Sequence, residues 1–350
     1  MTSVDRGGAW HPLIELALAR LREFVREPEA IFWAFIFPIV ISVTLAIAFP
    51  GGGSKPVLVA VEPGGDTNAI RDALQRTPGV TVRDVPAGTE ARALREGEVH
   101  LLLVPTEPPT YRFDPTRAEG RAARLLVDEA LKRAAGRRDP WTAREAPVQV
   151  AGSRYVDWLI PGIVGMNIMG TSMWGISFSI VTARMRKLLK RLIASPMRRR
   201  DFLLAQLLAR VVFLAPEVIV PLAFGALVLG MPIQGSWASI AAVCTIGALA
   251  FGAIGLLAAT RVRTIEGISG LMNVIMLPMW ILSGVFFSSS NFPDAVQPFV
   301  HALPLTSLVD ALRTVILDGG GVSAVRGELA QLAAWAVVPF GLAVSLFRWR

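Results

Sequence analysis

Two ionisable residues stand within one apolar stretch of the chain, residues 207–230. Arg210 and Glu217 are seven residues apart, so a helix would place them on the same side, two turns from each other. An ionisable group inside such a stretch is a candidate functional site, and Glu217 could relay protons or contact a cationic substrate. It could equally be structural, either paired with Arg210 or facing a water-filled seam.

Polar and helix-bending residues occur in two further apolar runs. Asn167 lies in residues 158–182, whereas Asn273 and Pro278 lie in residues 265–287. An amide in such a run binds substrate or, more often, hydrogen bonds to a neighbouring helix, and a proline bends its own helix. The candidates for a substrate path are therefore Asn167, Glu217, Asn273 and Pro278.

A third group is almost uniformly basic. Residues 184–206 carry eight Lys or Arg and a single acid, Asp201. In a helix, one apolar stripe would oppose these bases; it consists of Met185, Leu188, Leu189, Leu192 and Ile193. Pro196 would end the helix after Ser195. Such a helix either contacts anionic lipid or docks on a partner protein, and the stripe and the proline favour docking.

No recognisable catalytic, metal-binding or phosphate-binding motif is present in the sequence. The glycine-rich residues 51–55, GGGSK, lack the spacing of a phosphate-binding loop. Cys244 is the single cysteine, and the three histidines, His11, His100 and His301, are far apart. We therefore expect no enzyme activity and no cofactor in this chain, so an active pump would draw its energy from another subunit or an ion gradient.

Composition indicates an integral membrane protein. Of the 350 residues, 53 % are hydrophobic, and the mean hydropathy is +0.52; a soluble protein has roughly 45–50 % apolar residues. The formal net charge is +8. Bases placed on one side of a bilayer explain this charge better than nucleic-acid binding, because they are not interleaved with aromatics in a soluble segment.

The order of the apolar runs predicts an α-helical membrane protein with six transmembrane helices. An amphipathic helix within residues 1–29 would lie on the membrane surface, followed by a first span at 30–49 that Pro38 would kink. A small α/β domain is expected within 50–157, with strands at 57–61 and 99–104 and helices at 67–75, 90–95 and 118–135. The part 158–350 would contain the remaining spans, at 158–182, 207–230, 237–260, 265–287 and 329–347.

The distribution of basic residues sets the expected orientation. With the N-terminus in the cytoplasm, the basic segments 184–200 and 261–263 and the C-terminal Arg348 and Arg350 all fall on the cytoplasmic side. The α/β domain and the loop 288–327 then lie outside. Both termini are expected in the cytoplasm.

Several stretches resemble the permeases of type-2 ABC exporters, in order along the chain. Residues 191–197, RLIASPM, are similar to their RLL-(A/T)-(S/T)-P-L element. Residues 160–166, IPGIVGM, are similar to the opening of their second span, and residues 26–28, REP, to the end of their first amphipathic helix. The later stretches LSGVFF, LPLT and DALR resemble their LSG-(V/I)-FF…PLT…ALR region; they begin at 282, 303 and 310.

One departure from the family pattern lies just before the RLIASPM stretch. The usual Arg-Glu-x-Gly of these permeases is replaced here by Arg184-Met185-Arg186-Lys187.

The resemblance implies the permease subunit of a bacterial inner-membrane exporter, paired with a second and usually identical chain. Two copies of a separate ABC ATPase would hold the ATP and magnesium. Residues 184–194 would be the cytoplasmic coupling helix, residues 1–29 the connecting helix, and 288–327 an extracellular re-entrant region. The coupling contacts would come from Arg184, Met185, Lys187, Leu188, Lys190, Arg191, Leu192 and Pro196.

A basic cytoplasmic entrance and apolar spans suit an amphiphilic substrate, such as a lipid, drug or natural product, moved out of the cytoplasm or inner leaflet. Two alternatives belong to other classes. One is an ion-coupled secondary transporter using Glu217, and the other is a membrane-anchored sensor or binding protein acting through its extracytoplasmic domain. No inverted repeat supports the first, and six spans exceed what an anchor needs.

Overall fold

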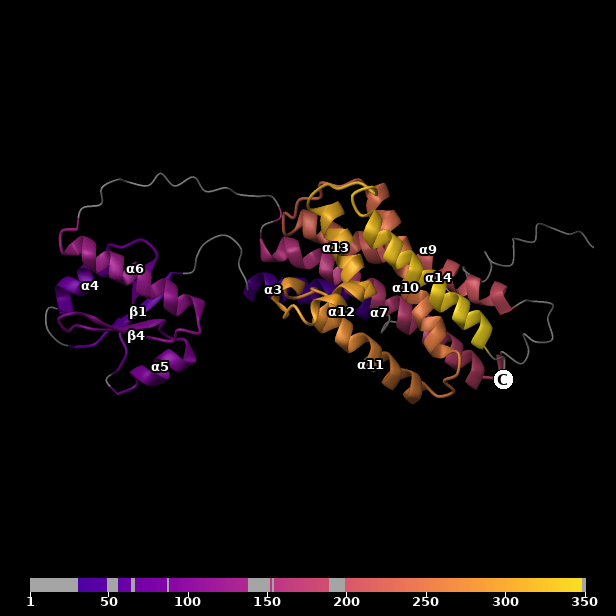
Figure 1. Cartoon of the computed structure of the whole chain (residues 1–350), viewed down its shortest axis with the longest axis horizontal. Coiled ribbons are helices and arrows are strands. Elements are labelled where there is room, and N and C mark those ends of the chain that lie inside the picture. Colours follow the sequence, from indigo (N-terminus) through magenta and orange to yellow (C-terminus); the bar gives the residue numbers. More distant parts are fainter. Residues whose placement is uncertain are drawn as a thin grey trace, which may run out of the picture. The chain divides into compact units, whose positions relative to one another are not determined.

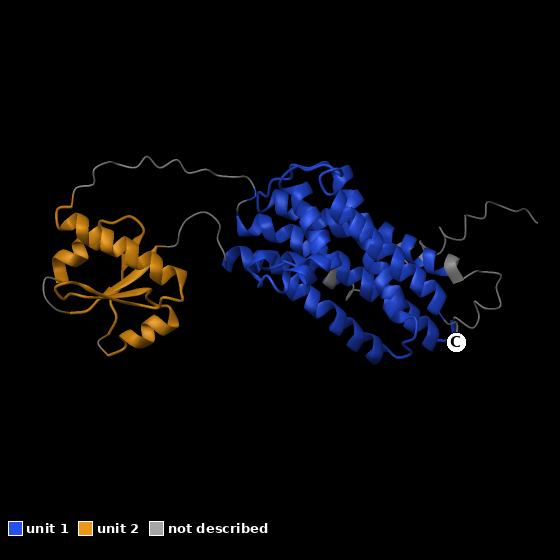
Figure 2. Ribbon diagram, viewed as in Figure 1, with its two compact units in different colours: residues 1–51, 149–350 blue, residues 52–148 orange. Residues whose placement is uncertain are grey.

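A computed structural model describes most of the chain and divides it into two compact units. The described residues are 31–48, 56–63, 67–86, 88–137, 152, 154–188 and 199–347. One unit comprises residues 1–51 and 149–350 and the other comprises residues 52–148 (Figure 2). The amphipathic helix expected within residues 1–29 and the basic C-terminal residues Arg348 and Arg350 lie outside the described residues.

Five helices of the first unit are long and apolar enough to cross a membrane. They are α7 (Tyr155–Met185), α9 (Arg199–Leu227), α10 (Trp237–Ala259), α11 (Ile265–Leu282) and α14 (Arg326–Leu346). Each overlaps one of the spans expected after residue 158. The protein is therefore mostly helical, as predicted, with five candidate spans among the described residues.

The span expected at 30–49 is represented by a shorter apolar helix, α3 (Phe37–Ala48), preceded by a π-helical turn, η1 (Phe32–Ile36). Pro38 explains where the wide turn lies, because proline lacks the N–H that would bond to the carbonyl four residues earlier. The hydroxyl of Ser42 donates to the Pro38 carbonyl at 2.7 Å. With α3 the chain would have six spans, and that count stays a prediction.

Helix α10 is central to this unit, packing against α7 and α14 (Figure 1). Small residues permit the close approach of α10 to α7: a Cβ atom at Gly252 would lie 2.9 Å from the Ile176 side chain, and one at Gly255 would lie 2.9 Å from the Met173 carbonyl. Gly252 follows the buried Ala248 by four residues, and a small-xxx-small pair of this kind permits tight helix contacts. By contrast, α11 and α14 are mostly exposed and present apolar side chains outward.

The loop between α11 and α14 folds into η2 (Ser289–Asn291), α12 (Gln297–Ala302) and α13 (Pro304–Ile316). Helix α13 packs against α7, α10 and α14 and buries most of its residues. The Thr306 hydroxyl donates to the Val300 carbonyl at 2.7 Å, which fixes the corner between α12 and α13. This segment is thus part of the helical core.

The second unit is a small α/β fold. Its sheet has the order β2-β1-β3-β4; β1 (Val57–Val61), β2 (Val80–Val82) and β3 (Leu101–Val104) are parallel, and β4 (Thr110–Phe113) is antiparallel to β3. Helices α4 (Thr67–Gln75) and α6 (Ala118–Ala134) cover one face, and α5 (Glu90–Glu96) covers the other (Figure 1). Strands β1 and β3 and all three helices match the expected positions. Strands β2 and β4 were not predicted; they are short and only partly buried.

Candidate functional site

Glu217 of α9 forms a buried ion pair with Arg210 of the same helix. The side chains are 1 % and 7 % exposed, respectively. Arg210 Nη1 donates to Glu217 Oε1 at 3.0 Å, and Nη2 donates to Glu217 Oε2. This is the pairing that the spacing of seven residues allowed. The two-point contact leaves neither charge unpaired in a region where an unpaired charge is costly.

Helix α7 completes this cluster with two hydroxyl groups. Arg210 Nε donates to the Ser172 hydroxyl at 2.9 Å, and Nη2 donates to Thr171 Oγ1 at 2.6 Å. Thr171 Oγ1 also lies 3.0 Å from Glu217 Oε2 and 2.7 Å from the backbone carbonyl of Asn167. The cluster therefore joins α7 to α9 and brings the predicted residues Asn167 and Glu217 to one place.

The other two candidates for a substrate path lie apart from this cluster. Asn273 and Pro278 occupy an exposed face of α11, next to the exposed apolar residues Val274, Leu277 and Ile281. The side-chain amide of Asn273 makes no hydrogen bond to any residue that the structure describes. Within one copy of the chain, the four candidates thus do not form a single site.

Arg184 lies at the end of α7 that is predicted to face the cytoplasm, and its guanidinium donates hydrogen bonds to backbone carbonyls of this chain. Its Nη1 donates to the carbonyls of Ala259, at 3.0 Å, and Val262, and its Nη2 donates to the Thr260 carbonyl at 3.0 Å. Carbonyls at a helix C-terminus lack helical partners and attract a cation. Arg184 therefore ties the end of α7 to the end of α10. Its guanidinium also lies 5.9 Å from the ring centroid of Phe347.

The basic segment departs from the single helix expected at 184–194. Helix α7 ends at Met185, and Lys187 has a φ of 56°, a left-handed conformation in which a side chain crowds the backbone. The chain turns there, so residues 184 and 185 belong to the long helix α7. Of the predicted contact residues, Lys190, Arg191, Leu192 and Pro196 lie outside the described residues.

The described part of the basic segment presents both apolar and basic side chains. Met185 is 51 % exposed and Leu188 is 41 % exposed. Arg186 and Lys187, between them in sequence, are also exposed. The turn after α7 therefore displays apolar surface flanked by positive charge.

Arg313 joins three helical segments at the opposite end of α7 and was not predicted as a site residue. Its Nε donates to the Trp158 carbonyl at 3.2 Å, and its Nη2 donates to the Gly284 carbonyl at 2.6 Å. The guanidinium lies 3.5 Å from the ring centroid of Trp158, a cation–π contact. It thereby connects α13 with the first turns of α7 and with the turn after α11.

Thr171 and Ser172 were also missed as partners of the ion pair. Thr171 follows Asn167 by four residues, so the two share a helix face, but no sequence pattern places that face against Arg210. Arg313 lies in the DALR stretch quoted above, and its partners likewise follow only from the packing of α7, α11 and α13.

Comparison with known proteins gives a consistent result. The family model described as "ABC-2 type transporter" matches residues 133–317. The chain is 28 % identical to Nodulation protein J of Bradyrhizobium diazoefficiens over 209 residues, which are 58 % of this chain and 77 % of that protein. It is 30 % identical to Nodulation protein J of Rhizobium meliloti over 31 % of this chain and 41 % of that one. It is also 27 % identical to the inner membrane transport permease YhhJ of Escherichia coli, over 35 % of this chain and 32 % of that one.

Proposed function

The chain belongs to the ABC-2 type transporter family, and from this premise we propose that it is the membrane-spanning permease subunit of an ATP-driven exporter. A separate ATPase subunit, present in two copies, supplies the energy and holds the ATP and magnesium. The permease moves an amphiphilic substrate, such as a lipid, drug or natural product, out of the cytoplasm or inner leaflet. It resides in a bacterial inner membrane with both termini in the cytoplasm.

The turn after α7 is the observation that carries this proposal. Met185 and Leu188 expose apolar surface beside Arg186 and Lys187, and apolar side chains with a basic rim suit a protein partner better than water. Arg184 holds this end of α7 against the end of α10 through hydrogen bonds to three carbonyls. The ATPase docks on this turn and displaces α7 and α10 when it closes around ATP.

A second copy of the chain supplies the other half of the path. Few residues of helix α11 are buried, and its exposed face carries Asn273, whose amide has no hydrogen-bond partner among the described residues. Such an amide facing lipid is unfavourable, whereas across a helix–helix contact it can be satisfied. We place Asn273 and Pro278 at this interface between two identical chains, where the substrate passes.

Glu217 has a structural role in this proposal. Both of its carboxylate oxygens accept hydrogen bonds, from Arg210 and from Thr171. A proton relay has to release and regain its proton during each transport cycle, and the two-point pair with Arg210 opposes protonation. Ion-coupled transport through Glu217 is therefore a weaker hypothesis than ATP-driven export.

The test uses the full chain, purified with the ATPase that co-purifies with it and reconstituted in vesicles. Met185→Glu and Leu188→Glu place charge on the proposed docking surface and are expected to lower substrate-stimulated ATPase activity at least tenfold. The matched control is Leu125→Glu, because Leu125 is 66 % exposed on the α/β unit and remote from this turn in sequence. Unchanged co-purification and ATPase stimulation in both Met185→Glu and Leu188→Glu would exclude docking at this turn.

A further inference from the structure

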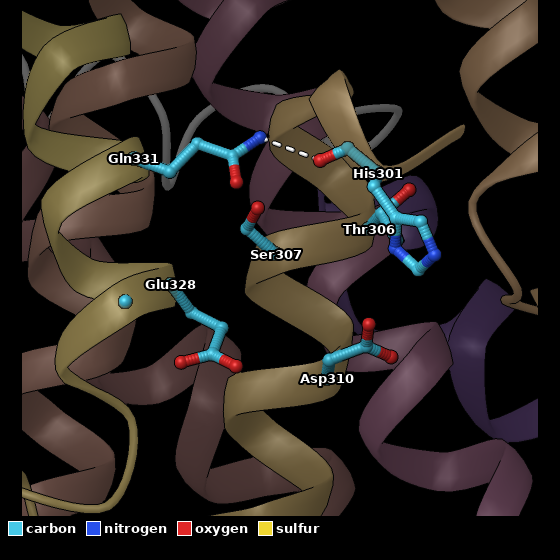
Figure 3. Close-up of a pocket in the computed structure, with 7 residues that line it drawn as sticks. His301, Thr306, Ser307, Asp310, Glu328 and Gln331 are labelled. Atoms are coloured by element: carbon cyan, nitrogen blue, oxygen red, sulfur yellow. Dashed lines mark hydrogen bonds between the residues drawn. The ribbon is translucent and has the colours of Figure 1, made fainter. Parts of the chain in front are cut away.

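A polar cavity of about 290 Å³ lies between α12, α13 and the first turn of α14. Figure 3 shows the side chains that line it, with Glu328 and Gln331 on α14 and the others on α12 and α13. They are His301, Thr306, Ser307, Asp310, Glu328 and Gln331. None of these residues belongs to the ion-pair cluster or to the turn after α7, so the cavity is a separate feature of the fold.

One of the two carboxylates on this cavity lacks a counterion among the described residues. Glu328 forms no ion pair or hydrogen bond with any described residue. Asp310 forms a long ion pair with Arg313, at 3.9 Å between Oδ1 and Nη1, while Arg313 Nε and Nη2 donate to the Trp158 and Gly284 carbonyls. The N-terminus of α14 offsets part of the charge of Glu328. The cavity therefore keeps a negative balance that a bound cation would neutralise.

A hydroxyl without a hydrogen-bond partner among the described residues also lines the cavity. Ser307 is only 4 % exposed, and its Oγ makes no hydrogen bond to any residue that the structure describes; it lies between α13 and α14 in Figure 3. Gln331 donates its Nε2 to the His301 carbonyl at 2.7 Å, which leaves its amide oxygen without a donor. Both oxygens can therefore accept a hydrogen bond from a ligand.

From these contacts we propose that the cavity binds a primary ammonium group. Glu328, Asp310, Ser307 and Gln331 all offer acceptor oxygens, and a primary ammonium has three N–H donors on one positive centre. A quaternary ammonium is disfavoured because it favours the faces of Trp, Tyr or Phe, and the lining residues include none of these three types. A metal ion is also disfavoured, because the described residues contain no group of three His, Cys, Asp or Glu side chains that could hold one.

The ammonium group has two possible sources, a free alkylamine or the headgroup of phosphatidylethanolamine. Both present the same R–NH₃⁺ group, and the cavity has the size of a small headgroup. The proposed site is formed by residues of this chain and does not depend on ATP-driven export, so binding can be tested on the permease alone.

The experiment measures binding of n-butylammonium by isothermal titration calorimetry to the full chain in phosphatidylglycerol nanodiscs. Glu328→Gln removes one charge and touches no described partner, so it is expected to fold normally and to weaken binding about tenfold or more. Ser307→Ala and Asp310→Asn should each weaken it as well. Asp294→Asn is the control, because Asp294 is exposed in the same loop and does not line the cavity.

Two outcomes would overturn the proposal: unchanged affinity in Glu328→Gln, or equal affinity of the wild-type chain for butyltrimethylammonium. Binding is also expected to weaken as the pH falls. Burial raises the pKa of Asp310, although Arg313 and His301 oppose this shift and Glu328 adds to it. Protons then compete with the ammonium at a higher pH than they would at an exposed aspartate.

A second arm identifies the source of the ammonium group. Nanodiscs containing phosphatidylethanolamine are compared with those of phosphatidylglycerol alone. A weaker apparent affinity for n-butylammonium in the former is expected if the lipid headgroup occupies the cavity. An equal affinity in both assigns the site to a free amine.

Discussion

Arg210 binds α7 to α9 through a buried ion pair with Glu217, a buried contact with Ser172 and a part-buried contact with Thr171. Removing one partner leaves the other charge alone in an apolar region. Arg210→Met is therefore expected to lower stability by about 3–5 kcal/mol. The double variant Arg210→Met/Glu217→Leu removes both charges and should recover most of that loss. Thermal unfolding of the purified chain measures both effects.

The same pair of variants separates a structural role from a functional one. If the cluster only joins the two helices, the double variant should transport substrate in the reconstituted complex at close to the wild-type rate. A double variant that unfolds at the wild-type temperature but no longer transports would instead place Glu217 or Arg210 on the substrate path.

At the scale of single elements, the end of α7 is the most distinctive local feature. Lys187 has a φ of 56°, and a residue with a Cβ pays about 1–2 kcal/mol for that conformation. Glycine does not, which is the reason that helices so often end on one. In the Arg-Glu-x-Gly pattern of type-2 ABC exporter permeases, glycine stands at the position of Lys187. This chain makes the left-handed turn there with a lysine.

Replacing this lysine tests the turn directly. Lys187→Gly is expected to stabilise the chain by about 1 kcal/mol, after allowing for the greater freedom of glycine in the unfolded state. Arg186→Gly is the control, because Arg186 has an ordinary φ of −75° and should lose stability instead. Equal destabilisation by both variants, measured by thermal unfolding, would contradict the left-handed assignment.

Some elements could be predicted from the sequence because their signal is local. Strands β1 and β3 are continuous apolar runs, and long apolar stretches predict helices α7, α9, α10, α11 and α14. Strand β4, TYRF, is exposed at alternate residues and begins two residues after Pro108, so the sequence did not predict a strand there. The turn at Lys187 was missed because neither its residue type nor the apolar periodicity favours a break there.

Site residues depend on contacts between distant segments, and this limited their prediction. The spacing of Arg210 and Glu217 indicated their pairing because both lie on one helix. The hydroxyls of Thr171 and Ser172, the carbonyls that Arg184 contacts and the carbonyls that Arg313 contacts come from other helices. Those partners follow from packing, which the periodicity of one segment does not encode.

For the molecule as a whole, the orientation in the membrane is the main prediction still to be tested. The chain has one native cysteine, and Cys244 is buried, so a Cys244→Ala background allows single reporters. Gln75→Cys on the α/β unit and Arg186→Cys after α7 both lie at exposed positions. In intact cells, a membrane-impermeant maleimide is expected to label Gln75→Cys alone.

Inside-out vesicles provide the matching measurement, in which Arg186→Cys should react and Gln75→Cys should be protected. Reaction of both cysteines from the same side would contradict the predicted arrangement, in which the α/β unit and the basic segment lie on opposite sides of the bilayer.

The hydrogen bonds of Arg184 have a mechanical consequence for a machine driven from this end. They fasten the last turn of α7 to the last turn of α10, and α10 packs along α14. A force applied at residues 186–188 is therefore transmitted to several helices together, so no single span can move independently. If the proposed ATPase docks on this turn, weakening these hydrogen bonds would uncouple it: ATP would be hydrolysed without movement of the substrate.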